Sequence, residues 1–256
     1  MIHPTAIIDA KAKLHDGVEI GAYSIIGPEV EIGENTEVGH HVVIEGPTKI
    51  GSGNRIFPFA TIGTESQDQK FKGEVAYLEI GQNNTIREYV TINRGTAGGG
   101  GITRVGSDGW FMACCHIAHD CLIGDGVTMA NGSLLAGHVI IKNYVSLGGL
   151  TGVQQFCQIG EYGFTGGQSM ITLDVAPFSR VAGISAKLID VNYIGLERRG
   201  FLPEEIEVIN QAYKIYFRSG LTRNAAIEKI ESELPESDHV RTFIDFVKAS
   251  ERGVCR

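Results

Sequence analysis

An apolar, mostly aliphatic residue stands at every sixth position along the first two thirds of this 256-residue chain. The period is unbroken over residues 2–62, resumes over 80–92 and runs again over 105–159, before it closes at Ile171. Six matches neither the period of an α-helix, about 3.6 residues, nor the simple alternation of one long strand. Each unit is therefore a short strand followed by a turn, and α-helix is excluded up to Ile171.

A second row of side chains shares this period. Two positions before each apolar residue stands a small or β-branched one, as at Val18, Val42 and Ala60, and we expect both rows to face inward. Three units make a triangular coil, and coils stacked about 4.8 Å apart form a prism whose backbone hydrogen bonds run from coil to coil. Glycine often follows the apolar residue, as at Gly21 and Gly51, which we attribute to a tight corner with unusual backbone angles. The sequence predicts a mostly β fold, a parallel β-helix of hexapeptide repeats over residues 1–185.

Two insertions interrupt the repeat, and a solenoid accepts insertions as loops that leave one corner. Residues 63–79 are polar and charged, whereas residues 94–104 are rich in glycine. The four consecutive glycines could suggest a phosphate cradle, but no helix start follows them and the Lys-Ser/Thr pair of a P-loop is missing. We therefore expect this second insertion to be a flexible loop.

The composition changes after Ile171, where the hexapeptide period ends. Pro203 suits the first position of a helix that ends at Ser219-Gly220, and further helices are expected from Thr222 and Ser237. These signals predict a C-terminal helical domain over residues 186–256, which covers one end of the prism.

The charge and the cysteines limit the class of protein. A formal net charge of −8 argues against nucleic acid or an anionic membrane surface as the main partner. No signal peptide and no apolar run of membrane-spanning length is present, so we expect a cytoplasmic protein without a transmembrane segment. Five cysteines without framework spacing indicate reduced thiols, in agreement with a reducing compartment.

Three of the eight histidines gather in the repeat, at His116, His119 and His138. One coil after His119 comes Gly137, with His138 beside it, and one further coil brings Gln155 into the same corner column. These histidines could be solvated turn residues. Alternatively, a neutral imidazole can take a proton near pH 7, and Asp120 beside His119 could hold its orientation, which favours a general base.

Two other chemistries use the same region and fit it less well. A metal site would combine the histidines with Cys114, Cys115 and Cys121, yet no paired Cys-x-x-Cys spacing is present. Cys115 and Cys121 fall in the inward row, where a thiol acts as a small hydrophobe and cannot reach a substrate outside the prism. We therefore expect no metal and no nucleophilic cysteine. A γ-carbonic-anhydrase type of metalloenzyme and a purely structural β-helix remain as alternatives.

Longer motifs resemble those of the UDP-N-acetylglucosamine O-acyltransferases that begin lipid A synthesis. They cover nearly the whole chain and comprise His116–Cys121, Leu135–Val139, Gln155–Cys157, Gly195–Phe201, Ala212–Lys214, Arg218–Gly220 and Arg252–Gly253. The resemblance implies left-handed winding and a homotrimer with active sites between chains. It also implies transfer of a 3-hydroxyacyl chain from acyl carrier protein to the 3-position of a UDP-sugar, without a cofactor.

The resemblance assigns roles to individual residues. His119 matches the general base, Asp120 the residue that orients it and the Gly137 N–H the oxyanion donor. Gly167 matches the position that sets acyl-chain length. Substrate-binding positions are implied at Gln67, Asp68, Lys70, His116, His138, Gln155, Asn192, Arg198 and Arg199. The acidic carrier protein would dock on Lys214, Arg218 and Arg223.

Three positions depart from the family pattern. Asn93 and Gln154 stand where many members have histidine, and Ile194 replaces an acidic residue. These changes bear on the acceptor, because some relatives use a 3-amino analogue of the sugar and form an amide. We expect the ordinary 3-hydroxyl, with the amino sugar as an alternative. Another hexapeptide acyltransferase, such as the lipid A N-acyltransferase, is a further alternative. An extra N-terminal domain would favour the N-acyltransferase, whereas here the repeat starts at residue 2.

Overall fold

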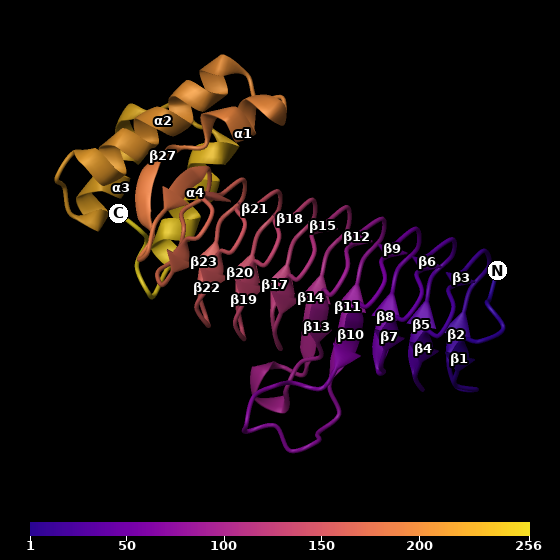
Figure 1. Cartoon of the computed structure of the whole chain (residues 1–256). Helices are drawn as coiled ribbons and strands as arrows, with labels where there is room; N and C mark the ends of the chain where they lie inside the picture. The colour runs from indigo at the N-terminus through magenta and orange to yellow at the C-terminus, as the bar shows by residue number, and fades with distance from the viewer.

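The computed structural model describes residues 1–256 as a prism of stacked triangular coils with a group of helices at its C-terminal end (Figure 1). Each coil contributes one short strand to each of three sheets, and strands in a sheet pair in parallel with those one coil away, except for the last strand of the third sheet. The first sheet contains β1 (Ile7–Ile8), β4 (Ile25–Ile26), β7 (Val43–Ile44), β10 (Thr61–Thr64), β13 (Thr91–Asn93), β16 (His116–Ile117), β19 (Leu134–Leu135), β22 (Gly152–Val153) and β25 (Met170–Ile171).

The other two faces of the prism are built in the same way. The second sheet contains β2 (Lys13–Leu14), β5 (Val30–Ile32), β8 (Thr48–Ile50), β11 (Tyr77–Ile80), β14 (Ile102–Val105), β17 (Leu122–Ile123), β20 (Ile140–Ile141) and β23 (Gln158–Ile159). The third contains β3 (Glu19–Ile20), β6 (Glu37–Val38), β9 (Arg55–Ile56), β12 (Thr85–Ile86), β15 (Trp110–Phe111), β18 (Thr128–Met129), β21 (Ser146–Leu147), β24 (Phe164–Thr165), β26 (Ser179–Ala182) and β27 (Lys187–Val191).

The two inward rows form the prism core, as the period predicts. A cluster of 38 buried residues runs along the axis, and the apolar residues of successive coils lie in register, as in Ile62 opposite Ile92 and Ile92 opposite Ile117. The small residues of the second row, including Val42, Ala60 and Cys115, are buried with them. Stacking therefore buries apolar surface that a single coil would leave in water.

The glycines after the apolar residues have a different cause from the one expected. The residues with positive φ mostly stand three positions after the apolar residue, as at Tyr23 (φ 59°) and Asn35 (φ 55°), and among the glycines that directly follow an apolar residue of the repeat only Gly63 (φ 75°) has a positive φ. A Cβ on Gly33 would instead lie 2.6 Å from the backbone carbonyl carbon of Gly51 in the next coil. The corner explanation is thus wrong for these glycines, since close stacking of neighbouring coils excludes the side chain.

The prism also extends beyond Ile171, where we expected the repeat to end. Val175 and Val181 join the axial core, and β26 continues the third sheet in parallel with β24. The chain then turns back, and β27 pairs with β26 in antiparallel direction. The period is lost here because the spacing of the inward residues changes, although their burial continues.

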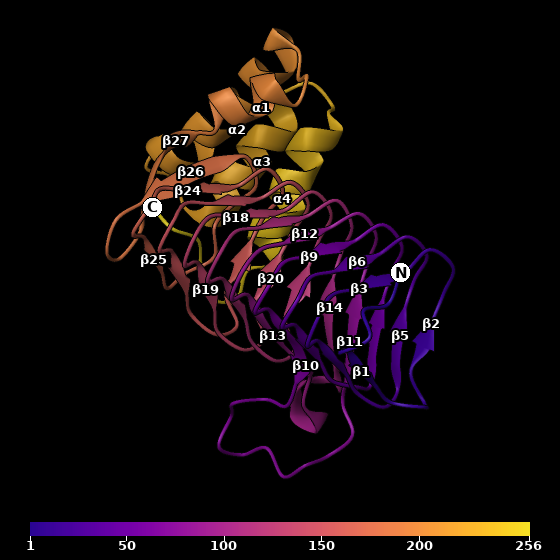
Figure 2. The same ribbon diagram turned by 45° about the vertical axis from the view of Figure 1, so that its right-hand side comes forward.

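The helical group consists of α1 (Tyr193–Arg198), α2 (Pro203–Arg218), α3 (Arg223–Glu233) and α4 (Asp238–Ala249). Pro203 opens α2, and the Thr222 hydroxyl accepts a hydrogen bond from the Ala225 N–H at the start of α3, as the sequence signals predict. The helices enclose a second core of 17 buried residues and stand over the last coils of the prism (Figure 2). None of them is both long and apolar enough to span a membrane.

Both insertions leave the prism at the corner between the first and second sheets. The first connects β10 to β11, and the second connects β13 to β14 through a short 3₁₀ turn at Ala97–Gly99. Figure 1 shows the two loops side by side below the prism. The next three coils turn the same corner at His119, His138 and Phe156, so the loops and the predicted histidines share one edge of the molecule.

Candidate active site

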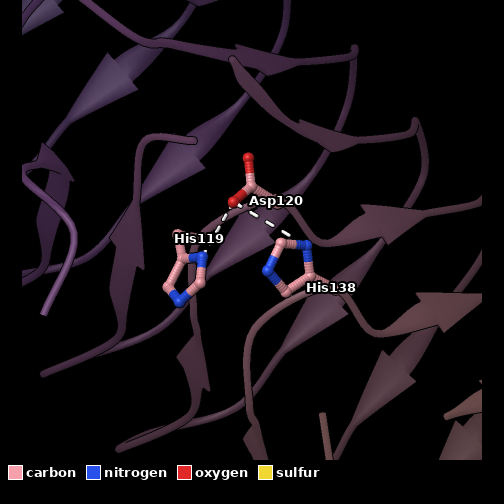
Figure 3. A group of neighbouring side chains, drawn as sticks. All are labelled: His119, Asp120 and His138. Atoms are coloured by element: carbon pink, nitrogen blue, oxygen red, sulfur yellow. Dashed lines mark hydrogen bonds and ion pairs between the residues drawn. The ribbon is translucent and has the colours of Figure 1, made fainter. Parts of the chain in front are cut away.

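His119 and Asp120 turn the corner between β16 and β17, and His138 turns it one coil later, between β19 and β20. Asp120 (φ 59°) and His138 (φ 63°) occupy equivalent left-handed positions of their coils. Figure 3 shows both imidazole rings beside the Asp120 carboxylate. The 18-residue coil therefore brings together side chains that the sequence separates, as predicted.

The closest contact in this group joins His119 to Asp120. His119 Nδ1 lies 2.8 Å from Asp120 Oδ2, and the carboxylate is completely buried, whereas the imidazole is 13% exposed. The carboxylate also accepts hydrogen bonds from the Thr96 N–H (2.8 Å) and the Thr96 hydroxyl (2.7 Å). With Nδ1 held in this way, Nε2 carries the lone pair of a neutral imidazole and is free to accept a proton.

The two neighbouring histidines favour their neutral forms. Burial lowers the pKa of His138, although the negative charge of Asp120 opposes this effect. Burial also lowers the pKa of His116, and so does the proximity of His119. His116 Nδ1 lies 2.7 Å from the Thr91 hydroxyl, and His138 stacks on Phe156 with ring centroids 4.4 Å apart. Both rings are therefore fixed, and near pH 7 they offer neutral donors and acceptors.

Gly137 lies directly against the imidazole of His119. A Cβ at this position would come within 2.5 Å of His119 Cε1 and 2.6 Å of Nε2, so only glycine fits beside the ring. The Gly137 N–H donates no hydrogen bond within the chain. A free backbone donor thus stands next to the nitrogen that can accept a proton, an arrangement that suits a developing oxyanion.

The first loop carries the predicted Gln67, Asp68 and Lys70. The Asp68 carboxylate accepts a hydrogen bond from the Lys70 N–H (2.9 Å), and its charge acts on His138, where it opposes the lowering of the pKa. Gln67 and Lys70 are exposed, with side chains available to a ligand. The loop therefore reaches the histidine corner from the side of the earlier coils.

The first half of the second loop packs against Asp120. Thr96 is buried on Asp120, and a Cβ on Gly99 would lie 2.0 Å from the carboxyl carbon of Asp120. The expectation of a flexible glycine-rich loop therefore needs correction for this part. Gly98, Gly100 and Gly101 have open space beside them.

Other predicted residues lie in separate places on the same chain. Asn192, Arg198 and Arg199 line a cavity of about 570 Å³ beside α1, together with Tyr144, Ser146, Tyr162, Phe164, Arg180, Ile194 and Gly195. The Arg199 guanidinium lies 4.7 Å from the centre of the Tyr144 ring. Gly167 is at the corner between the third and first sheets, in a shallow cavity of about 690 Å³ with Cys114 and Leu150. Gln155 is exposed next to Phe156 at the histidine corner.

The metal and thiol alternatives meet specific obstacles. Ligand atoms of His119, Asp120 and His138 lie within 4.8 Å of one another, but the Asp120 carboxylate already accepts three hydrogen bonds, which compete with a metal ion for its lone pairs. Burial raises the pKa of Cys115 to about 11 and that of Cys121 to about 12. A thiolate at either position is disfavoured, as the inward row predicts.

Several residues of the site were not singled out from the sequence. Phe156 follows His138 by one coil, so the period itself could have placed it at the same corner. Thr96 comes from an insertion outside the repeat frame, and no spacing rule connects it to Asp120. Tyr144 and Tyr162 stack one coil apart with centroids 5.0 Å apart, but no sequence signal links them to α1.

Known proteins match this chain over its whole length. The family described as Udp N-acetylglucosamine O-acyltransferase, domain 2, matches residues 174–255. An acyl-[acyl-carrier-protein]--UDP-N-acetylglucosamine O-acyltransferase of Herminiimonas arsenicoxydans is 48% identical over 260 residues, covering 100% of this chain and 99% of its own length. A protein of the same name from Anaeromyxobacter dehalogenans is 49% identical over 258 residues, with the same coverage.

Solved structures give the same result. LpxA from Acinetobacter baumannii superposes with a TM-score of 0.97 at 44% identity, covering 100% of this chain and 99% of that one. LpxA from Bacteroides fragilis, a UDP-N-acetylglucosamine acyltransferase, superposes with a TM-score of 0.98 at 41% identity, covering 100% of both chains. The prism is accordingly a left-handed parallel β-helix followed by C-terminal helices, and the chain belongs to the UDP-N-acetylglucosamine O-acyltransferase family.

Proposed function

We propose that this protein transfers a 3-hydroxyacyl chain from acyl carrier protein to the 3-hydroxyl of UDP-N-acetylglucosamine, the first step of lipid A synthesis. The single observation that carries the chemistry is the corner of His119: Nδ1 is held by buried Asp120, Nε2 is free, and the unused Gly137 N–H is beside it. The names of full-length relatives supply the two substrates.

The proposed reaction is general-base acyl transfer. His119 Nε2 takes the proton of the sugar hydroxyl as its oxygen attacks the thioester carbonyl carbon. The carbonyl oxygen becomes an oxyanion that the Gly137 N–H stabilises. The tetrahedral intermediate collapses, the C–S bond breaks, and the proton on His119 passes to the leaving thiolate. Asp120 holds the imidazole in the tautomer that accepts at Nε2 and stabilises the imidazolium that forms.

The binding roles follow the same proposal. Gln67, Asp68, Lys70, His116 and His138 would hold the sugar at the histidine corner. Gln155, Asn192, Arg198 and Arg199 would hold the UDP part, for which the aromatic and cationic cavity beside α1 offers stacking and charge-assisted hydrogen bonds. Gly167 leaves room for the acyl chain, while Lys214, Arg218 and Arg223 would dock the acidic carrier protein in the cytoplasm.

We also propose a homotrimer with each active site between two chains. The outer face of the first sheet, next to the histidine corner, carries exposed apolar side chains that include Ile7 (64% exposed) and Leu134 (50%). The second sheet instead presents Lys13, Glu31 and Lys49 at equivalent positions of successive strands. An exposed apolar face of this kind favours association with another copy.

The test is a transfer assay with purified protein, UDP-N-acetylglucosamine or its 3-amino analogue, and 3-hydroxyacyl carrier proteins of several chain lengths. We expect an ester product from the ordinary sugar. Product from the amino sugar alone would correct the acceptor, whereas no product from any pair with folded protein would overturn the acyltransferase proposal.

A further inference from the structure

Thr96, in the glycine-rich loop, touches the buried carboxylate on which His119 depends. Its N–H donates to Asp120 Oδ1 at 2.8 Å, and its hydroxyl donates to Oδ2 at 2.7 Å. Oδ2 is also the oxygen that faces His119 Nδ1. One threonine therefore supplies two of the three donors to this carboxylate, and it shares one oxygen with the imidazole.

The surroundings of Asp120 make these two hydrogen bonds important. The side chain is fully buried, and its ion-pair partners within 4 Å are His119 and His138, with no lysine or arginine among them. Gly99 packs on the carboxyl carbon and keeps the site closed on that side. A buried carboxylate without a cationic partner needs hydrogen-bond donors to stay ionised, and here the loop provides them.

We propose that Thr96 is a positioning residue for acyl transfer: its hydroxyl fixes Asp120 Oδ2 and so sets both the orientation and the proton affinity of His119. The inference rests on the proposed role of His119 as base. Thr96 touches neither the acyl chain nor the sugar in this proposal, and it acts only through Asp120. The glycine-rich insertion then belongs to the catalytic apparatus.

Thr96→Val removes the hydroxyl donor and keeps the shape and the backbone N–H. A carboxylate that has lost one donor attracts the imidazolium proton more strongly, so less base is free at low pH. We expect kcat to fall by about 10- to 100-fold, with little change in the KM for the sugar nucleotide or the KM for the acyl carrier protein. The acid limb of the kcat/KM profile should move to higher pH, while Thr96→Ser, which keeps the hydroxyl, restores both properties.

The matched control is Thr103→Val in β14, directly after the glycine-rich loop. The Thr103 hydroxyl accepts a hydrogen bond from the Asp120 backbone N–H at 2.8 Å and does not reach the carboxylate. This variant should be less stable, while the acid limb of its kcat/KM profile stays at the same pH. His116, His138 and Asp68 face the same corner and are unchanged in all three variants, so their titration contributes equally to every profile.

The outcomes separate this inference from the proposed function. If the unmodified protein transfers acyl chains but Thr96→Val retains its kcat and pH profile, or if Thr96→Ser is impaired as strongly as Thr96→Val, the positioning role is wrong. If the unmodified protein transfers no acyl chain, the proposed function itself is overturned. Circular dichroism and thermal unfolding of each variant exclude simple failure to fold.

Discussion

Replacing His119 by alanine should remove the base and leave the prism intact. General-base catalysis contributes about 10²- to 10⁴-fold to a rate, so we expect a loss of kcat of that order. Asp120 loses one of its three donors, which should lower the free energy of unfolding by about 1 kcal/mol. His15→Ala is the control, since His15 is exposed and pairs only with Glu31. Transfer rates near the unmodified value in His119→Ala would contradict the assignment.

Gly137→Ala tests the space beside the imidazole. The added methyl group would lie 2.5 Å from His119 Cε1, so the ring must shift away from the oxyanion donor. We expect kcat to fall by at least about tenfold, because misplacement of a catalytic group by about 1 Å can cost about 10²-fold. Gly98→Ala, where nothing lies within 4 Å of the new Cβ, should retain its activity in the same assay.

The partly buried histidines His116 and His138 predict a pH dependence of stability. Burial lowers the pKa of His116 and His138 in the folded state, so the unfolded chain binds protons more readily. Their contribution to stability is therefore fully present above the unfolded pKa of about 6.5 and is lost as the pH falls through the folded values. Denaturation midpoints measured between pH 8 and 5 should decrease, and His116→Gln should reduce that decrease. A midpoint independent of pH would contradict the burial of these rings as neutral groups.

At the level of single residues, the sequence could place what the period controls. His119, Gly137 and His138 are related by one coil, so the repeat predicts that they share a corner, and the structure confirms it. Thr91 and His116 likewise stand directly before residues of the apolar row in successive coils, so the repeat also places them side by side. Thr96 depends on how an insertion folds back, a property without a sequence period, so its contact with Asp120 could not be predicted.

Among the elements, Asn93 joins the stems of the two loops. Its side-chain amide donates to the Thr64 hydroxyl (3.0 Å) and to the Glu65 carbonyl (2.9 Å), where the first loop leaves the prism. The Arg94 N–H donates to the Thr64 carbonyl beside it. Because the second loop holds Asp120 and the first carries Asp68 and Lys70, this junction fixes two parts of the site relative to each other.

Asn93→Asp should loosen this junction. Both donors are lost, and a carboxylate then faces the Glu65 carbonyl, so the first loop should move away from the histidine corner. We expect KM for the sugar nucleotide to rise by about tenfold or more, with KM for the acyl carrier protein nearly unchanged. Asn84→Asp is the control: Asn84 is buried in the prism and bonds only within it, so stability should fall without this change in KM.

The elements also show why one sequence argument was wrong. Glycine after the apolar residue was explained by backbone angles, yet Gly33 and Gly51 are required by the distance between coils. The sequence shows that glycine is required at these positions, but it does not show which contact excludes a side chain. Likewise, the hexapeptide period ended at Ile171 although Val175 and Val181 stay in the core, because burial can continue after regular spacing is lost.

For the whole molecule, the apolar face of the first sheet predicts assembly. Leu134→Arg places a charge on that face, next to His116, and should convert the proposed trimer of 27.6 kDa chains to smaller species with little activity. Leu122→Arg makes the same change on the second sheet, where the leucine is 39% exposed, and should leave the mass and the activity unchanged. Light scattering measures the mass, and equal masses for both variants would contradict an interface on the first sheet.

A mixing experiment tests whether two chains build each site. His119 and the pair Arg198 and Arg199 lie in separate places on one chain, so a shared site would take the histidine from one copy and the arginines from its neighbour. His119→Ala and the double variant Arg198→Ala/Arg199→Ala should each be nearly inactive. In trimers formed from an equal mixture, about one site in four combines an intact histidine with intact arginines, so about a quarter of the activity should return. If both groups act within one chain, every site in the mixture carries one defect, and no activity returns.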